Sequence, residues 1–546
     1  MAVRPLLSAL ALLALALAPD AAPAASGRAG VDLEALAVRL ADPAGQEAAL
    51  RELADVDDPA AARLLRALKD GALYRVAGRF VVLGDDGAIT DLTGRPVRDA
   101  RGQPLALEGG QEPVALEERL FGTVQGLLER FELLSPDPKA RRAAALRLGN
   151  ARDGAAYAVL ARARARETDP AVRAVLDEAL ARLELAAPEA SARAAAARRL
   201  GAERSDAALA QLRALAAEDP DPQVRAAARE AIRAIETHVV LRNLVGYAFN
   251  GVSLGAVLLL MSLGLAVTFG LMGIINMAHG EMLMIGSYTA YVVQELFAAH
   301  APAAQDAYFL VALPLAFVTA GLVGLALELG VLRLLYGRPL ETLIVTWGIG
   351  MILQQGARLT FGDQTSVNPP AWFRGGVEPM AGLVLPWSRI FIVGLALAAL
   401  GALWLLLTRS WAGVRVRAVM QNRPMAACLG VSTRRIDAVT FALGTALAGV
   451  AGCALALIGT VDPEVGKTYI VDSFMVVVLG GVGRLAGLVA AAFGVGVANK
   501  LLEPAIGGTA AAVYAKVAVL GLVIWLLQWR PAGLFPPRGR AAAEAA

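Results

Sequence analysis

The sequence predicts an all-α protein, in which a polytopic membrane helix bundle of about eight segments follows an exported domain of α-helical repeats with a small β insertion. The distribution of charge supports this division. Residues 1–239 contain 67 of the 99 Lys, Arg, Asp and Glu side chains, whereas 240–546 contain only 32. Because a bilayer core tolerates few ionisable groups, the second part is predicted to lie in the membrane and the first in water.

The chain begins with the features of a secretory signal peptide. Arg4 precedes an apolar run from Leu6 to Ala18, and small residues ending in AAPAAS follow. The run is too short to span a bilayer comfortably, so cleavage near Ala24 or Ala25 is expected, and 1–25 is assigned as the signal peptide. An uncleaved anchor is the alternative, and either form exports the soluble part.

Two segments of the soluble part recur with a period of 52 residues. RRAAALRLG at 141–149 returns as RAAAARRLG at 193–201, and DPAVRAVLDEAL at 169–180 returns as DPQVRAAAREAI at 221–232. Each unit is interpreted as two amphipathic helices with Asp-Pro at a helix start, where Asp can cap and Pro fits the first turn. The pattern over 136–239 resembles a HEAT-like repeat, which predicts a spacer or a protein-docking domain.

A different pattern precedes the repeats. YRVAGRFVVLGDDGAITDLTGRPVRD at 74–99 alternates and breaks at Asp-Gly and Thr-Gly, which predicts a small strand pair. Residues 33–70 have a helical pattern. The region 26–135 is therefore assigned as an exported helical region with a small strand pair, and nothing in it resembles a catalytic constellation.

Eight apolar segments follow residue 239, each near the roughly 20 residues that are needed to cross the hydrocarbon. The membrane domain is assigned to 240–536 and a C-terminal tail to 537–546. The segments lie at 244–272, 279–298, 308–335, 342–361, 389–408, 437–459, 472–498 and 510–529.

A basic island at 409–435 sets the orientation of these segments. It contains six Arg and no acid in 27 positions, and Arg in a short loop is retained on the cytoplasmic side during insertion. Working backward, the 335–341 loop falls inside and the 299–307 loop, which has no Lys or Arg, falls outside. The soluble domain is therefore predicted to be periplasmic, and the island, which mixes small side chains with Arg and amides, to bind a soluble partner.

The seventh segment, VVVLGGVGRLAGLVAAAFGVGV, places Gly480, Gly481, Gly483 and Arg484 where the middle of the bilayer is expected. A broken or re-entrant helix is predicted, because a plain lipid-facing helix would not carry an Arg there. Its freed backbone groups would make the three glycines candidates for lining a translocation path. Close helix packing through pairs such as Gly483 and Gly487 is the alternative.

Three polar residues concentrate at the start of the second segment, in GIINMAHGEMLMIGSY. Asn276, His279 and Glu281 would be costly if left in lipid, so they are expected at the interface or paired inside. They are interpreted either as a hydrogen-bonded turn between two spans or as direct contacts to a substrate. A metal site is not predicted, because His238 and His300 are not spaced to complete one with His279.

Several motifs resemble a known family. NMAHGEMLMIGSY, GVRVRAVMQNRPMAACLGV, VVVLGGVGRLAG and RPAGLF resemble the branched-chain-amino-acid-type permeases of ABC importers, over about 245–536. Within that family, RPLETLIVTWGIGMILQQ at 338–355, VNPPAW at 367–372 and YIVDSFMVVVLGGVG at 469–483 resemble the urea ABC transporter permease.

The resemblance implies a passive permease of the bacterial inner membrane that is driven by separate cytoplasmic ATP-binding subunits. This chain has no GxxxxGK[ST] phosphate loop, so it is not expected to be an enzyme or to bind a cofactor. A periplasmic substrate-binding protein and a second permease subunit, identical or homologous, are the other implied partners; nucleic acid is not. The island matches the loop that, in these importers, inserts a short coupling helix into the ATPase. The matching positions are Arg415, Arg417, Gln421, Asn422, Ala426, Ala427 and Gly430.

Urea is small, neutral and rich in donors and acceptors, so a path for it needs polar rather than charged side chains. A zwitterionic amino acid would need charge complementarity, and the midspan regions offer little beyond Arg484. Together with the resemblance of the fourth segment and of VNPPAW to the urea permease, this makes import of urea, or of short amides, the leading prediction. Branched-chain amino acid import is the alternative, and a membrane-anchored helical-repeat receptor or scaffold is the alternative of another class. The fourth segment provides candidate residues for lining the translocation path: Thr342, Thr346, Trp347, Gln354 and Gln355. The alternative is that these side chains only pack one helix against another.

Overall fold

A computed structural model describes residues 33–53, 59–76, 78–84, 88–97, 113–150, 154–273, 276–481, 484–531 and 533–535. The predicted signal peptide, the predicted C-terminal tail and Gly483 lie outside the described residues. The chain divides into two compact units, Met1–Thr237 and His238–Ala546. Each unit is described by itself.

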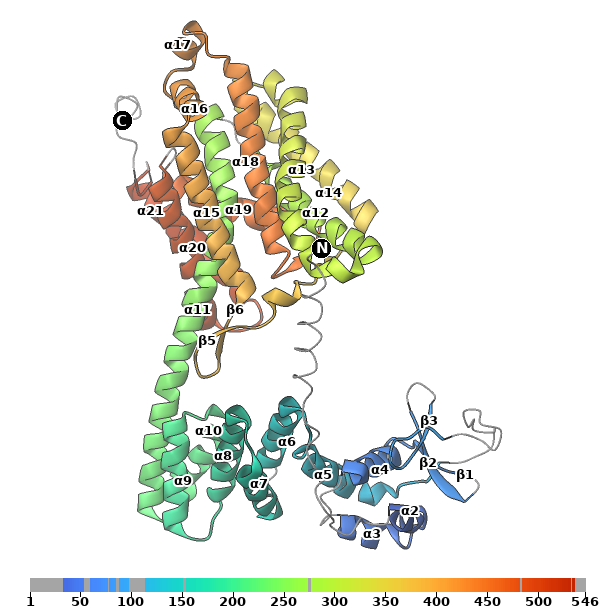
Figure 1. Ribbon diagram of the computed structural model, residues 1–546. Coiled ribbons are helices and arrows are strands. Elements are labelled where there is room, and N and C mark those ends of the chain that lie inside the picture. The colour runs from blue at the N-terminus through green and yellow to red at the C-terminus, as the bar shows by residue number, and fades with distance from the viewer. Residues whose placement is uncertain are drawn as a thin grey trace, which may run out of the picture. The chain divides into compact units, whose positions relative to one another are not determined.

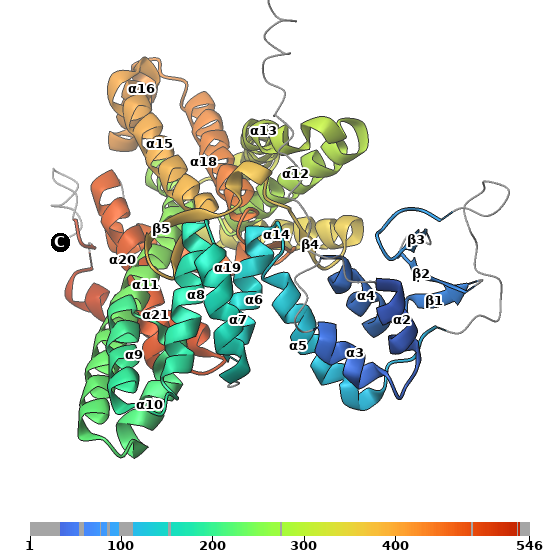
Figure 2. The same cartoon turned by 60° about the horizontal axis from the view of Figure 1, so that its bottom comes forward.

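The first unit begins with three helices and a small antiparallel sheet (Figures 1 and 2). The strands lie in the order β1-β2-β3, so the predicted pair is in fact a three-stranded sheet. The third strand is only three residues long and pairs with β2 from Val81 opposite Asp91 to Leu83 opposite Ile89. The elements are α2 (Leu33–Ala41), α3 (Gln46–Leu53), α4 (Pro59–Lys69), β1 (Leu73–Val76), β2 (Arg79–Leu83) and β3 (Ile89–Asp91).

Each 52-residue period contains three helices, not the two that the sequence predicted. The middle helices, α7 and α10, lie between the segments in which the sequence recurs. Asp-Pro does start helices as expected: Asp169 accepts hydrogen bonds from the backbone of Ala171 and Val172 at the start of α8. The helices are α5 (Phe121–Glu132), α6 (Pro138–Asn150), α7 (Gly154–Arg166), α8 (Pro170–Glu184), α9 (Ala190–Glu203), α10 (Leu209–Glu218) and α11 (Pro222–Met272), the last of which continues into the second unit.

The two periods share a buried ion pair at equivalent positions. Arg141 binds Glu167 through two hydrogen bonds of 2.8 and 3.0 Å, and 52 residues later Arg193 binds Asp219 at 2.8 and 3.0 Å. In both periods the remaining terminal nitrogen of the Arg donates to the backbone carbonyls before the first helix. Because a bidentate pair of this kind fixes geometry as well as charge, it locks the first helix of each period against the end of the second.

We expect the Arg141 pair to make the first period sensitive to acid. The hydrogen bonds from Arg141 lower the pKa of Glu167 from 4.5 to about 2. A lowered folded-state pKa adds stability at pH values above 4.5, at most about 3 kcal/mol, and this stability is lost as the pH falls toward 2. In hydrogen–deuterium exchange on the full chain, Glu167→Gln should therefore speed exchange of the amides of α6 to α8 at pH 7. At pH 3, the difference in stability between the variant and wild type, as measured by this exchange, should be about half as large. Glu189→Gln, an exposed control, should change neither. An equal gap at both pH values would contradict the expectation.

The second unit is a bundle of long helices. Six helices in the described part are long and apolar enough to cross a membrane by length and composition. Seven of the eight predicted segments correspond to single helices, but the predicted seventh segment, 472–498, is two helices, α19 and α20, with a break at 481–484. From α11 on, the helices are α12 (His279–His300), α13 (Tyr308–Gly330), α14 (Pro339–Phe361), α15 (Trp387–Arg409), α16 (Trp411–Gln421), α17 (Arg423–Cys428), α18 (Thr433–Leu455), α19 (Val465–Gly480), α20 (Leu485–Ile506) and α21 (Ala511–Trp529).

The loops that were predicted to lie outside meet at one end of this bundle. Strands β4 (Thr365–Ser366) and β7 (Thr460–Val461) pair with each other, and β5 (Gly376–Met380) forms a hairpin with β6 (Leu383–Pro386) at this end (Figure 1). The Tyr308 hydroxyl donates to the carbonyl of Asn368 at 2.9 Å, which joins the start of α13 to the same loops.

The loops that were predicted to lie inside meet at the other end. The Arg423 guanidinium of α17 lies 4.8 Å from the ring centre of Tyr336, in the link between α13 and α14. The backbone N–H of Leu534 donates to the carbonyl of Leu479 at 2.8 Å, so the chain after α21 contacts the end of α19. The alternation of loops between the two ends therefore agrees with the predicted topology.

Glycines bring the central helices α12, α18 and α19 into backbone contact. A Cβ atom on Gly280 would lie 2.8 Å from the carbonyl oxygen of Gly466, and Gly286 faces the carbonyl of Gly449 so closely that no side chain fits. Such small residues let helices approach closely, which is how helices associate where lipid supplies no hydrophobic driving force. These contacts place α12 and α18 side by side at the centre of the unit, where most of α18 is buried.

Candidate functional site

The island folds as two short helices, α16 and α17, at one end of the membrane unit (Figure 1). Ser410 caps α16, and the Asn422 side chain caps α17 by accepting from the backbone N–H of Met425 at 2.9 Å. Gly430 follows α17 with a φ of 82°, a left-handed conformation that glycine adopts without strain. The caps and the glycine thus make α17 a separate short helix between α16 and α18.

The predicted docking residues are mostly exposed on these two helices. Ala426 alone is buried, in a small cluster with Val419. Two apolar side chains that the sequence reasoning did not single out are also exposed, Met425 by 57% and Leu429 by 78%. Exposed apolar groups beside cations are typical of a protein-binding surface. The exposed predicted residues are Arg415, Arg417, Gln421, Asn422, Ala427 and Gly430.

Arg423, which the sequence reasoning also missed, anchors α17 to the bundle. Its guanidinium forms an ion pair with Asp437, a fully buried carboxylate near the start of α18, and covers the ring of Tyr336. Removing one partner of a buried pair leaves an uncompensated charge and is strongly destabilising. Arg423 therefore holds α17 against α18 and against the link between α13 and α14.

A second group of polar residues lies inside the bundle between α12 and α14. The Gln354 amide donates to Glu281 Oε1 at 2.7 Å, and the Thr346 hydroxyl accepts from the backbone N–H of Met277 at 3.2 Å. The three residues predicted from the second segment, Asn276, His279 and Glu281, are all at least 96% buried. They are thus paired inside rather than placed at the interface.

This polar cluster lies deep in the bundle and has unused hydrogen-bonding atoms. His279 Nε2 lies 3.2 Å from the carbonyl of Met261, which is eleven residues, or about 16 Å, before the end of α11 at Met272. Since a carbonyl only accepts, Nε2 is the donor. Within the described residues, His279 Nδ1, Asn276 Nδ2 and Glu281 Oε2 have no partner. Buried polar atoms of this kind call for a ligand or water.

The other fourth-segment candidates do not join the cluster. Thr342 is buried, but its hydroxyl donates to carbonyls at the start of its own helix, Leu335 and Arg338. Trp347 is 55% exposed and Gln355 is also exposed, so both lie on the outer surface of α14 in this unit. Of the five, Gln354 bonds to Glu281 of α12, and Thr346 bonds to the backbone of Met277 in the link before α12.

Gly480 and Gly481 are not in the middle of the bundle, which corrects the prediction for the seventh segment. α19 ends at Gly480 and α20 begins at Leu485, and Gly481 has a φ of 87°. Gly481 and Arg484 share a pocket with Val416 and Met420 of α16, so they lie at the end that carries the island. The helix is broken as predicted, but at the end of the bundle, and these two glycines do not support a path lining.

Charged groups occur inside the bundle at other positions. Lys516 of α21 forms an ion pair of 3.1 Å with Asp472, a buried carboxylate of α19. With Glu281, this contradicts the expectation that the midspan regions offer little charge beyond Arg484, which itself lies at the island end. Among the described residues, no three His, Cys, Asp or Glu side chains gather to hold a metal ion.

Comparison with known proteins identifies the family. The family described as branched-chain amino acid transport system / permease component matches residues 247–527, from α11 to α21. The chain belongs to this permease family. It is therefore a permease component and a multi-pass membrane protein, as its helices indicate.

The permease has relatives in several bacteria. It is 30% identical over 290 residues to the high-affinity branched-chain amino acid transport system permease protein BraD of Pseudomonas aeruginosa, which covers 52% of this chain and 93% of BraD. The corresponding protein LivH of Escherichia coli is 30% identical over 296 residues, with the same coverage. LivM of Escherichia coli is 28% identical over 315 residues, 52% of this chain and 69% of LivM. No solved structure matches. These relatives are named for branched-chain amino acids, so they favour that alternative over the urea prediction.

Proposed function

We propose that the protein is the translocation subunit of an ABC importer for branched-chain amino acids. The family match across α11 to α21 carries this proposal. The buried Glu281 supports the substrate class, because a carboxylate with an open oxygen inside a membrane unit is suited to accept hydrogen bonds from an ammonium group. The polar cluster of Asn276, His279, Glu281, Thr346 and Gln354 is the proposed contact to the substrate.

The end of the unit that carries α16 and α17 is the proposed docking site for a separate cytoplasmic ATPase. Exposed Arg415 and Arg417 supply directional hydrogen bonds, and Met425 and Leu429 supply apolar contacts. The ion pair between Arg423 and Asp437 then passes movement of α17 to α18. Energy from ATP would thus reach the helices through a mechanical contact.

Location and other partners follow from the same orientation. With the island in the cytoplasm, the five long helices before it, α11 to α15, would place the start of α11, and with it the first unit, in the periplasm if each crosses the membrane in turn. A periplasmic substrate-binding protein would deliver substrate there. The likeness to both LivH and LivM of one organism supports a second, homologous permease subunit as partner.

Urea import is the second candidate. The motifs at 338–355, 367–372 and 469–483 resemble the urea permease, and Gln354, Thr346 and Glu281 are also suited to a neutral amide, whose N–H groups would donate to the open carboxylate oxygen. Uptake measurements are therefore needed to decide between the two substrates.

Uptake in a deletion strain tests the proposal. Cells lacking this chain should lose uptake of labelled leucine and retain uptake of labelled urea, and the full chain supplied in trans should restore leucine uptake. A chain that keeps the signal peptide but lacks 26–235 should restore it at least partly, because the family match begins at residue 247.

The other outcomes are equally informative. Loss of urea uptake with normal leucine uptake would overturn the amino-acid assignment in favour of urea. Normal uptake of both would overturn transport and favour a membrane-anchored receptor or scaffold.

A further inference from the structure

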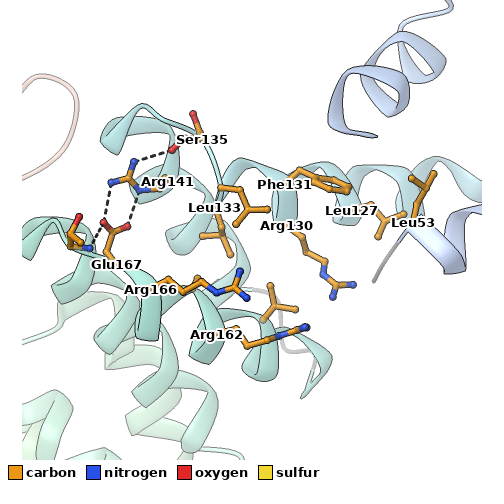
Figure 3. Close-up of a pocket in the computed structure, with 14 residues that line it drawn as sticks. Leu53, Leu127, Arg130, Phe131, Leu133, Ser135, Arg141, Arg162, Arg166 and Glu167 are labelled. Carbon is orange, nitrogen blue, oxygen red and sulfur yellow. Dashed lines mark hydrogen bonds and ion pairs between the residues drawn. The ribbon is translucent and has the colours of Figure 1, made fainter. Parts of the chain in front are cut away.

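The first unit contains a cavity of about 300 Å³ where α5 meets the first period of the repeat (Figure 3). Arg130 of α5 and Arg162 and Arg166 of α7 extend into the same space, as Figure 3 shows. The opposite side is lined by apolar side chains that include Leu127 and Phe131. A cavity of this volume is large enough for a small organic molecule.

The Arg141 pair at the edge of the cavity leaves Glu167 with no free oxygen for Arg130 or Arg162. Both carboxylate oxygens of Glu167 are bound to Arg141, and one also accepts backbone hydrogen bonds. In the described part of the chain, Arg130 and Arg162 form no ion pair with a carboxylate. Arg162 and Arg166 also lie four residues apart on one helix, where like charges disfavour each other.

The second period provides an internal comparison. An equivalent cavity lies there, lined at positions 52 residues later by Arg182, Gln211 and Ala214. Arg182, the counterpart of Arg130, is buried and donates to Asn150 at 2.6 Å. The counterparts of Arg162 and Arg166 are Ala214 and Glu218.

The two periods have a cavity in common but differ in the charge around it. Both periods keep the buried ion pair and the cavity, so these belong to the architecture of the repeat. Only the first period carries three arginines at the cavity, and the fold of the second shows that the architecture does not need them. Their placement around one space needs a different explanation.

We propose that this cavity binds a small organic carboxylate with an apolar body. Guanidinium groups bind carboxylates through paired, charge-assisted hydrogen bonds. Leu127, Phe131 and Leu133 then provide an apolar wall for the rest of the molecule. Among the described residues, Glu167 is the acid that lines the cavity, and Arg141 uses both of its oxygens. The described lining therefore offers no carboxylate to an ammonium group and is suited to a plain carboxylate rather than an amino acid.

Saturation-transfer NMR on the full-length protein in nanodiscs tests the proposal, with 4-methylpentanoate as the probe. Binding should weaken by about tenfold or more in the variant Arg162→Ala with Arg166→Ala, and also when the probe is replaced by the neutral 4-methylpentanamide or by leucine. Changing the same two positions to Lys should restore only part of the binding, because Lys returns the charge but not the paired donors of a guanidinium group.

Arg164→Ala is the matched control, since Arg164 lies on the same helix but pairs with Asp177 away from the cavity lining. It should leave binding unchanged. Wild-type affinity in the double Ala variant, equal binding of acid and amide, or no binding of 4-methylpentanoate would overturn the proposal. Equal binding of inorganic phosphate would also overturn it, because the apolar wall would then contribute nothing.

Discussion

Replacing Glu281 by glutamine is expected to lower leucine uptake by about ten- to hundredfold, the usual worth of one hydrogen bond to a charged group. Glutamine has nearly the same shape and can still accept from the Gln354 amide, so the contact between α12 and α14 remains. What is lost is the acceptor at Oε2, the oxygen that has no partner among the described residues, because an NH₂ group that can only donate takes its place. The expectation rests on the proposed transport function.

Two further variants show whether the charge or the packing matters. Glu503→Gln removes a carboxylate from a long helix outside the cluster, where it is paired with Lys500, and should leave uptake close to wild type. The exchange Glu281→Gln with Gln354→Glu keeps one carboxylate in the cluster and should recover part of the uptake. Wild-type uptake by Glu281→Gln would show that the cluster only packs helices.

Substituting Gly430 by arginine should abolish copurification of the ATPase and thereby all uptake. Gly430 has a φ of 82°, at which an L side chain is strained by about 1–2 kcal/mol, and its neighbourhood is otherwise open. The strain falls on the last turn of α17, and the new side chain projects from the exposed surface beside Leu429. The variant therefore changes the proposed docking surface and leaves the interior of the bundle unchanged.

Gly508→Arg is a matched control for this variant. Gly508 has a φ of 83°, is equally exposed and equally open, but lies between α20 and α21, away from the island. It carries the same strain and the same added charge, and should retain both the ATPase and uptake. If Gly430→Arg copurifies with the ATPase as well as Gly508→Arg does, α17 is not the docking helix.

The membrane helices could be predicted from the sequence wherever an apolar run has polar residues at both ends. Seven of the eight segments were found in this way. The break in the seventh segment was predicted, but it was placed in the middle of the bilayer. The stretch LGGVGR contains no proline or polar cluster to mark a helix end, and the left-handed conformation of Gly481 is not visible in the composition. The position of Arg484 was wrong for the same reason.

The repeat was found through the residues that hold it together. Arg141 and Arg193, and the Asp-Pro starts of α8 and α11, recur because each makes the same contact in both periods. The middle helices were missed because α7 and the segment 52 residues later, which includes α10, share only scattered Ala and Leu positions. That divergence is also what distinguishes the two cavities.

The candidate site was only partly accessible to sequence reasoning. Asn276, His279 and Glu281 were conspicuous because three polar residues stand together in an apolar region. Gln354 was proposed for its type, but its bond to Glu281 joins positions 73 residues apart, which no local pattern encodes. Arg423 and Asp437 were overlooked because their importance depends on the burial of one carboxylate.

The glycine contacts between α12 and α18 restrict where transport can produce motion. Where two backbones touch without intervening side chains, no rotamer change can absorb a shift, so these helices behave as a single rigid spine. α14 meets that spine through Gln354, Thr346 and stacked aromatic rings, and its other face is largely uncovered. Any motion that opens a passage beside Glu281 is therefore expected in α14, which meets these helices through side chains, and not between α12 and α18.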